Sequence, residues 1–491
     1  MRRRAMRIVT IVLSALLVVG SGAGAWAQPV PGATVEERAV NGAKAYLAKH
    51  GLKNVEQTIL LSSLYNNSFP DFSERWEKLT GIKIKIVPLG YTDIPAKIMA
   101  EAVAKTGQFD MFNDFPYTAP DAVGAGVIVP LDAYAERGKP DFSGVAPGLR
   151  YQQYYQGKLY TFVLDGDHLI LVLRKDLVEH PQVKAEYRAR FKKDPGCPAT
   201  MEEWEQMAAF FHTRPGQSRW GMTLDKGLYG AMGYRSINFS YRHFPAYFGG
   251  LYFDRDMNPR INTPHGVQAI KQFASIVKYM PPDIQGWGTP QIYPFWASGQ
   301  AFSVMSFPSI VGFGNSNEKS VIKDKQLACL VPQTKGVDGK LVRRSPQAAG
   351  TGYMVSKYGK HPELAYWFIQ WFTGPTVGDE AIAHPRGFWD PFRESNLKNA
   401  AIRKRFGEQF LATTMENSKY ATSLLMLEGN YEYFNVLDKN LADVMNNNVG
   451  AEEAARRIEA GWNKVTNDVG RSRQVQSWRQ GVESGIYLDK F

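Results

Sequence analysis

The sequence predicts an α/β protein made of two lobes, and three observations lead to this fold class. Strand and helix patterns alternate from residue 58 onward, which is typical of parallel sheets with right-handed crossovers. A similar alternation returns between residues 200 and 372. The chain has 491 residues, of which 44% are hydrophobic and 21% charged. This length and balance suit a globular protein of two or three domains.

The first unit has the order strand, helix, strand, helix, strand. Thr58–Leu64 is an apolar run of strand length, and the strict alternation over residues 82–86 predicts a second strand. Between them, Pro70 opens a helix that Gly81 closes. The order is completed by a helix between Asp93 and Gly107 and a strand at Phe109–Asn113.

The second unit repeats this pattern more loosely. Thr200 and Glu203 have the spacing of a capping box ahead of an apolar helix. Further elements are predicted as strands at Gly221–Leu224 and Ala301–Met305, as helices beginning at Pro264 and Pro362, and as a helical tail from Ala400 onward.

The first 27 residues have the features of a signal peptide. Four arginines precede the apolar stretch Ile8–Val19, which is about 12 residues long, whereas a membrane-spanning helix needs roughly 20. Ala25-Trp26-Ala27 then fits a signal-peptidase site. We expect cleavage after Ala27 and an exported protein, periplasmic in a Gram-negative cell.

Charge and cysteine content argue against a nucleic-acid-binding protein, a disulfide framework and a zinc site. The net charge is +11, but part of it lies in the leader, and elsewhere Lys and Arg alternate with Asp and Glu. No nucleic-acid partner is therefore expected. The two cysteines, Cys197 and Cys329, are too few for a disulfide framework or a zinc site. Whether they pair is left open.

Motifs of enzymes and of metal sites are missing. The sequence has no GxSxG, HExxH, GxxxxGK[ST] or GxGxxG, and its eight histidines are scattered. A calcium-loop pattern begins at Asp254 but fails at Pro259 and His265. We therefore expect no catalytic site, no metal and no cofactor.

Aromatic residues in the loops indicate a binding surface. Tyr65, Tyr91 and Phe115 follow predicted strand ends, where ligands bind in open α/β sheets. Rings beside Asp, Asn, Ser and Thr suit a sugar or polyol. Asp165 and Asp167 flank Gly166 between two apolar runs. These carboxylates resemble the acid and base pair of a glycan hydrolase, but their position favours contact with a ligand or a hinge.

Six segments, in this order, resemble the extracellular solute-binding proteins of ABC importers, family 1, which includes the maltose-binding proteins. They cover more than 300 residues from Thr58 to about Asp390. The segments are FDMFNDFPYTAPDAVGAGVIVPLDAY (109–134), GKLYTFVLDGDHLILVLRKDL (157–177), PATMEEW (198–204), FGGLYFDRDMNPRINTPHGVQAIKQF (248–273), FWASGQAFSVMSFPS (295–309) and AAGTGYMVSKYGKHPELAYWFIQWF (348–372).

The resemblance implies the type II periplasmic binding protein fold. Each lobe would be a mostly parallel sheet flanked by helices, with the ligand in the cleft between the lobes. Residues 28–165 and 332–388 would form the first lobe. Residues 168–330 and 390–491 would form the second, which includes the C-terminal helices. The chain would cross between the lobes near Asp165–His168, near Val331 and near Phe388–Pro391.

The resemblance also implies twelve ligand-binding positions, taken segment by segment. They are Tyr65, Asn66, Tyr91, Asp114, Asp165, Asp167, Ser306, Phe307, Thr351, Tyr353, Arg386 and Trp389. Around Ser306 and Phe307 the sugar binders of the family often carry a tryptophan. Its absence here argues against a maltodextrin-like ligand.

The implied function is that of a monomeric periplasmic protein. It would capture a carbohydrate or polyol by hinge closure and deliver it to the membrane subunits of an ABC permease. Three alternatives stay open. The ligand could be a glycerol phosphate or another small polar solute, the protein could feed a membrane sensor, or it could be a secreted glycan hydrolase.

Overall fold

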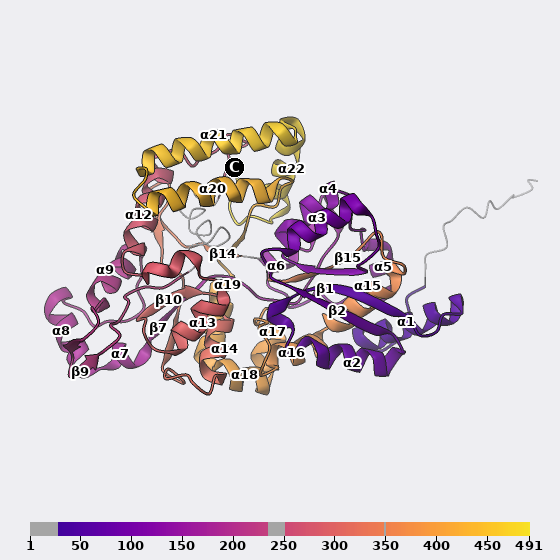
Figure 1. Cartoon of the computed structure of the whole chain (residues 1–491), viewed down its shortest axis with the longest axis horizontal. Helices are drawn as coiled ribbons and strands as arrows, with labels where there is room; N and C mark the ends of the chain where they lie inside the picture. Colours follow the sequence, from indigo (N-terminus) through magenta and orange to yellow (C-terminus); the bar gives the residue numbers. More distant parts are fainter. Residues whose placement is uncertain (1–27, 234–250, 348–349) are drawn as a thin grey trace, which may run out of the picture.

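The computed structural model describes residues 28–233, 251–347 and 350–491. Two α/β lobes lie side by side, and three C-terminal helices lie across one end of the pair (Figure 1). Helices and strands mix in both lobes, in agreement with the predicted α/β class. The signal peptide predicted at residues 1–27 lies outside the described residues.

The first lobe is built on a five-stranded sheet with the order β2-β1-β3-β15-β6. β1 pairs in parallel with both β2 and β3, and β15 runs antiparallel to β3. α2 and α3 make the connections between the parallel strands, as the sequence predicted. The bounds are β1 Glu56–Ser62, α2 Phe69–Thr80, β2 Lys83–Leu89, α3 Ile94–Ala104, β3 Met111–Asp114, β6 Phe162–Val163 and β15 Gly352–Val355.

Helix α15 (Pro362–Phe372) anchors the first lobe. All nine residues from Leu364 to Phe372 are buried, and eight of them are apolar or aromatic, as expected of a helix enclosed by other elements. It packs against β15 on one side and against α1 (Val35–His50) on another. At the start of α1, Thr34 and Glu37 form a capping box. The N-terminal segment is thus part of the lobe's core.

The second lobe has a three-stranded sheet of order β10-β7-β11, in which both pairs are antiparallel. β10 and β11 run in the same direction, joined through α14, and β7 lies between them in the opposite direction because it enters from the first lobe. This arrangement differs from the expected mostly parallel sheet. The bounds are β7 Ile170–Arg174, α8 Pro181–Phe191, α9 Met201–Phe211, α12 Pro264–Val277, α13 Thr289–Ala297, β10 Ser303–Ser306, α14 Ser309–Ser316 and β11 Gln326–Cys329.

The chain crosses between the two sheets from β6 to β7 and from β11 to β15, and a third segment lies near Phe388–Pro391; these three crossing segments lie against one another. The amide of Leu164 donates to the carbonyl of Thr351, at 3.2 Å. The amide of Gly166 donates to the carbonyl of Asp390, also at 3.2 Å. A Cβ atom on Gly166 would collide with the carbonyl oxygen of Pro391. The absence of a side chain at residue 166 is therefore what allows the first and third segments to touch.

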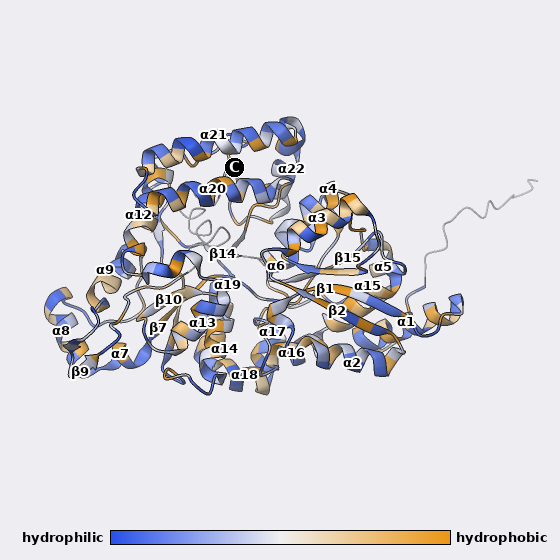
Figure 2. Ribbon diagram, in the orientation of Figure 1, coloured by the Kyte–Doolittle hydropathy of each residue, from blue (hydrophilic) through white to orange (hydrophobic). Residues whose placement is uncertain are grey.

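The three C-terminal helices contact both lobes (Figure 1). α20 (Asn430–Met445) and α21 (Ala451–Val469) pack on α12 of the second lobe. On the other side, the ring of Phe434 meets that of Tyr117 edge to face, with centroids 5.6 Å apart. Figure 2 shows that the outer surfaces of α21 and α22 (Arg471–Ser484) are mainly hydrophilic, so these helices bury only their inner faces.

The remaining elements are short and connect or cover the two sheets. They are η1 Ser63–Tyr65, η2 Pro116–Thr118, α4 Ala119–Gly124, α5 Asp132–Gly138, α6 Pro147–Tyr151, β4 Tyr154–Tyr155, β5 Lys158–Leu159, α7 Lys175–Glu179, β8 Gln217–Arg219, β9 Met222–Leu224, η4 Pro282–Gly286, β12 Thr334–Lys335, β13 Leu341–Val342, β14 Ser345–Gln347, α16 Pro375–Ala383, α17 Glu394–Lys398, α18 Ala400–Phe406, α19 Glu408–Ser418 and β16 Ala421–Ser423.

A disulfide joins Cys197 and Cys329, the pair that the sequence left open. Their Cα atoms are 5.4 Å apart, and 132 positions separate them in the chain. The bond ties the segment between α8 and α9 to strand β11. Because it closes a long loop, it restricts the unfolded chain more than a short-range bond would.

Replacing both cysteines with alanine should lower the free energy of unfolding by about 2–4 kcal/mol, since the unfolded chain regains the freedom of the closed loop. Urea unfolding of the variant and of the parent measures the difference. Dithiothreitol should bring the parent close to the variant and leave the variant unchanged. Equal stability of the oxidised parent and the variant would contradict this account.

Candidate functional site

A small cavity of about 30 Å³ lies between the two lobes. Residues from both sheets and from the crossing segments line it: Ser62, Leu64, Tyr65, Tyr91, Phe115, Asp165, Asp167, Thr289, Tyr293, Phe307, Ser309, Thr351 and Phe388. A volume of this size holds about two water molecules, whereas pockets for small organic ligands begin near about 300 Å³. The lobes therefore have to part before a sugar-sized solute can enter.

A chain of hydrogen bonds through Tyr65 connects the first lobe to the crossing segments. The Tyr65 hydroxyl donates to Oδ2 of Asp165 at 2.8 Å, and the Thr351 hydroxyl donates to the Tyr65 oxygen at 3.0 Å. The backbone amide of Asp390 donates to Oδ1 of Asp165 at 2.7 Å. Asp165 thus accepts bonds from two distant parts of the chain, and Thr351 joins the same network through Tyr65.

Three buried carboxyl groups come together at this point. Asp165, Asp167 and Asp390 each have an oxygen within 4.8 Å of an oxygen of the other two. Asp165 is 1% exposed and Asp390 is fully buried. The Asp390 carboxyl lies within hydrogen-bonding distance of the Asp167 carboxyl. Like charges this close, out of water, repel strongly.

Burial and mutual repulsion shift the acid–base behaviour of this cluster. Burial, and next the charge of Asp167, raise the pKa of Asp165 well above its ordinary value. Burial, and then the charges of Asp165 and Asp167, raise the pKa of Asp390 in the same way. Burial also lowers the pKa of the nearby His168 to about 4, so that its imidazole is neutral. Both shifts favour the protonated form of the Asp165 and Asp390 carboxyls over the ionised form.

Aromatic rings surround the carboxyl groups from both sides. On the first lobe, Tyr65 stacks on Trp389 with centroids 4.8 Å apart, and Tyr91 meets Phe115 edge to face at 6.3 Å. On the second lobe, Tyr293 lies 6.0 Å from Phe388, centroid to centroid. The cavity wall thus consists mainly of rings, with the carboxyl and hydroxyl groups between them.

Of the twelve predicted positions, six line this cavity: Tyr65, Tyr91, Asp165, Asp167, Phe307 and Thr351. The structure brings them together from both lobes, although they are spread over almost 290 residues of the sequence. The other six lie elsewhere, and three of these are buried without reaching the cavity: Ser306 and Tyr353 within strands β10 and β15, and Trp389 underneath Tyr65.

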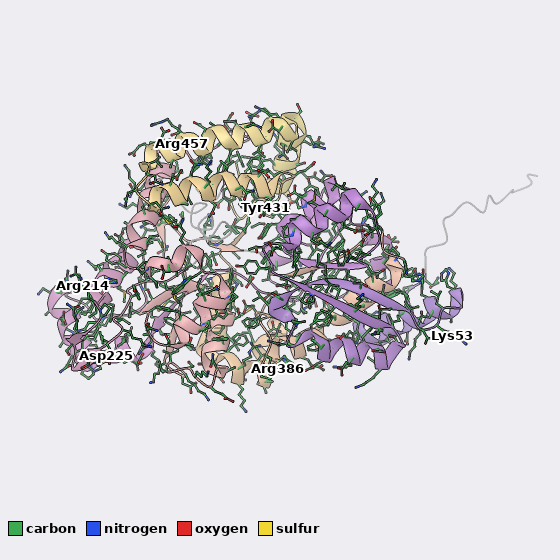
Figure 3. All side chains as sticks on the ribbon, viewed as in Figure 1. Lys53, Arg214, Asp225, Arg386, Tyr431 and Arg457 are labelled. Carbon is green, nitrogen blue, oxygen red and sulfur yellow. A yellow bond between two sulfur atoms is a disulfide. The ribbon has the colours of Figure 1, made fainter. Side chains whose placement is uncertain are left out.

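The remaining predicted positions lie outside the cavity for different reasons. Asn66 is exposed just after η1. Arg386 was expected to supply a donor to the ligand, but its side chain is 60% exposed and pairs with Asp71 on α2 at 3.0 Å. Figure 3 shows Arg386 on the outer side of the molecule. Asp114 lines a different cavity.

This second cavity has about 250 Å³ and lies between the first lobe and α20. It is lined by Pro95, Ala96, Ile98, Met99, Asp114, Thr118, Asp121, Ala122, Gly429, Tyr431 and Glu432. Oδ2 of Asp114 accepts from the Thr118 hydroxyl at 2.9 Å. Burial raises the pKa of Asp114 to about 7 and that of Asp121 to about 6.

Several lining residues escaped the sequence analysis. Thr289 and Tyr293 lie on α13, where the Tyr293 hydroxyl shares a hydrogen bond with that of Ser309 at 2.6 Å. Asp390 completes the carboxyl cluster. Its only sequence signal is an acidic residue in the Gly/Pro-rich connection that also holds Phe388.

The family described as bacterial extracellular solute-binding protein matches residues 63–379, which is more than half of the chain. The chain belongs to this family. The predicted resemblance is thereby confirmed, and the cavity between the lobes is where a protein of this kind would hold its solute.

One curated relative supports the assignment. A probable amino-acid ABC transporter periplasmic-binding protein, y4oP of Sinorhizobium fredii, is 23% identical over 309 residues, which are 62% of this chain. The match spans 65% of that relative's length. The alignment thus covers less than two thirds of either protein.

Solved structures establish the two-lobe fold. An ABC transporter solute-binding protein of Agrobacterium radiobacter K84, in complex with ribitol, has a TM-score of 0.71 at 18% identity and covers 84% of this chain and 99% of its own. One from Agrobacterium vitis S4, with bound D-mannitol, has a TM-score of 0.68 at 17% identity, covering 84% and 99%. The predicted fold class is confirmed. Among the described residues, no helix has the length and apolar character required to cross a membrane.

The difference in the free energy of unfolding between the Asp114→Asn variant and the parent should be more favourable to the variant at pH 7.5 than at pH 4.5. The ordinary pKa of Asp is about 3.9, and the folded value is about 7. Between these values the unfolded parent loses its proton while the folded parent keeps it. The parent is therefore destabilised as the pH rises, at most by about 1.4 kcal/mol per pH unit, and the effect levels off above pH 7.

Urea unfolding at both pH values measures this effect. Asp225→Asn serves as the control, because residue 225 is exposed and Figure 3 places it at the outer end of the second lobe. If Asp114→Asn lost the same amount of stability at both pH values, the buried carboxyl would be ionised throughout, contrary to the pKa shift.

Proposed function

We propose that this protein is the substrate-binding component of an ABC importer and captures a carbohydrate or polyol between its lobes. The observation that carries the proposal is the cavity in which rings, hydroxyls and carboxyls from both lobes converge. Rings stack on the C–H faces of a sugar, and oxygen acceptors bond its hydroxyls. The mannitol and ribitol complexes of the two structural neighbours support this ligand class.

Binding would stabilise the closed form of the protein. Tyr65, Tyr91 and Thr351 face the cavity from the first lobe, and Phe307 faces it from the second. Only a closed arrangement lets one solute touch all of them, so the solute shifts the equilibrium toward closure. A membrane permease that recognises the closed form would then receive loaded protein. We propose Tyr65, Tyr91, Asp165, Asp167, Phe307 and Thr351 as the ligand contacts.

The boundaries of the lobes and the route of export belong to the same proposal. Residues 28–165 with 332–388, and 168–330 with 390–491, would move as two bodies about the three crossing segments. The signal peptide would be removed after Ala27, leaving a monomer in the periplasm. The disulfide suits that oxidising compartment.

A phosphorylated ligand is disfavoured by the cavity's charges. Among the residues of the described chain that line it, the only charged groups are the carboxyls of Asp165 and Asp167. A glycerol phosphate would need several donors and positive charges there. We therefore retain sugars and polyols as the ligand class.

The test is thermal unfolding against a panel of sugars, polyols and glycerol phosphates. A ligand that binds only the folded protein stabilises it by RT ln(1 + [L]/Kd), about 2.7 kcal/mol at a hundredfold excess over Kd. We expect a rise in Tm with one sugar or polyol. No shift across the panel would contradict the proposed ligand class, and turnover of a glycan by pure protein would contradict a pure binding role.

Phe307→Ala should weaken binding of the solute identified in this way about tenfold, because it removes a stacking ring worth about 1–1.5 kcal/mol. Isothermal titration calorimetry measures the change. Phe491→Ala is the matched control, since this ring is 46% exposed near the C-terminus and does not line the cavity. An unchanged affinity in Phe307→Ala would show that this ring does not contact the solute.

A further inference from the structure

Another cavity, of about 320 Å³, lies between the first lobe and the last helix of the chain. The end of α6 and the β4–β5 hairpin form one of its walls, and α22 forms the other. We call it the hairpin cavity. Its volume reaches the roughly 300 Å³ at which pockets for small organic ligands begin. It shares no lining residue with the cavity between the lobes, so a solute can occupy it without the lobes having to part.

The residues of the hairpin cavity divide into a buried floor and an exposed rim. Tyr155, Met426 and Ile486 belong to the floor, since each is at most 7% exposed. Gln156 and Gln480 belong to the rim and are exposed. A solute that enters from the solvent would therefore meet apolar surface below it and amide groups at its edge.

The lining of the hairpin cavity is uncharged. Among the described residues that line it, none is Asp, Glu, Lys, Arg or His. Its polar side chains are the amides of Gln156 and Gln480 and the hydroxyls of serines and tyrosines. A charged solute would lose its hydration here without gaining an opposite charge, which is costly. The lining therefore favours a neutral solute with several hydroxyl groups.

The tip of the hairpin has an unusual backbone conformation. Gln156 has φ of +49° and Gly157 has φ of +76°, as in the two-residue type I′ turn, where Asn, Asp or Gly is the usual first residue. Glutamine in this conformation is strained, and such strain is common at binding sites. The amide of Gln156 donates to the hydroxyl of Tyr155 at 3.3 Å and to that of Ser477 on α22 at 3.4 Å. The turn thus holds this amide against α22 at the cavity.

Of the three tyrosines in the lining, Tyr154 is the one available for stacking. The hydroxyl of Tyr155 already accepts from Gln156, and the guanidinium of Arg150 lies over the ring of Tyr151, 5.7 Å from its centroid. Tyr154 is only partly buried, and it pairs with no other ring in the described part of the chain. A ring beside amides and hydroxyls can bind both the C–H face and the hydroxyls of a sugar.

We propose that the hairpin cavity is a second binding site and that it takes a small neutral carbohydrate. Tyr154 supplies the stacking face, and Gln156, Ser477 and Gln480 bond the hydroxyls of the solute. The site lies apart from the cavity to which the proposed function assigns the transported solute, and it goes beyond that function.

Isothermal titration calorimetry with D-glucose, D-galactose and maltose tests the proposal, over a concentration range that detects a Kd of about 1 mM. At least one of these sugars should bind. Two further probes examine the chemistry of the site: D-glucuronate adds a negative charge, and cyclohexanol keeps a six-membered ring but has a single hydroxyl. The neutral sugar should bind at least about tenfold more tightly than either probe.

Tyr154→Ala should weaken this binding about tenfold through loss of the stacking ring. Gln156→Gly should weaken it to a similar extent through loss of the amide. The Tm of Gln156→Gly should stay close to that of the parent, because glycine adopts a positive φ without strain while two long hydrogen bonds are lost. Weaker binding in this variant would therefore not reflect loss of fold. Tyr431→Ala is the matched control, since this ring is 41% exposed and lies outside the hairpin cavity.

The variants separate the two sites. A sugar that loses affinity in Tyr154→Ala and Gln156→Gly, but not in Phe307→Ala or Tyr431→Ala, would establish the second site. If the sugars that bind lost affinity only in Phe307→Ala, they would be held between the lobes, which would overturn the second site and support the proposed function. Binding of none of the three sugars, or an affinity that none of these variants changes, would also overturn it. Glucuronate or cyclohexanol binding here as tightly as the sugar would overturn the neutral carbohydrate class.

Discussion

The close contact of the three segments that cross between the lobes is the constraint on which the rest of the site depends. Gly166 lies against the Pro391 carbonyl, and Gly350, with φ of +50°, lies against the carbonyl of Asp165, so neither position has room for a Cβ atom. Backbone hydrogen bonds join the same segments. This contact brings Asp165 and Asp390 together although 225 residues separate them. The acidity of the cavity thus follows from the path of the backbone.

Local sequence patterns were sufficient to predict elements whose ends are set by their own residues. The alternation at residues 82–86 and the Pro70 and Gly81 boundaries predicted β2 and α2 to within a few residues. The break between two apolar runs singled out Asp165 and Asp167 as contacts to a ligand or a hinge, because a polar pair there interrupts two buried strands. Tyr65 and Tyr91, which line the cavity, follow strand ends that are visible in the sequence, whereas Thr351 was identified only through the family resemblance.

The other positions depend on contacts that no local pattern contains. Arg386 and Trp389 stand three residues apart in one connection, yet the first pairs with Asp71 at the surface and the second is buried under Tyr65. Thr289 and Tyr293 lie on α13 at i and i+4, a spacing that also fits an ordinary core face. Only the packing of α13 against the crossing segments decides that these residues reach the cavity.

The position of Asp165 shows how the crossing segments are joined to the site. Its carboxyl accepts from the Tyr65 hydroxyl of the first lobe and from the Asp390 amide of the last crossing, so one side chain connects the cavity wall to the crossing segments. A solute shifts the balance between open and closed lobes only by as much as it binds the closed form more tightly. Tyr65 and Thr351 line the cavity from the first lobe and Phe307 lines it from the second, so a solute that touches all three gains contacts that only the closed form offers. The residues that would select the solute are therefore also those through which it would favour closure.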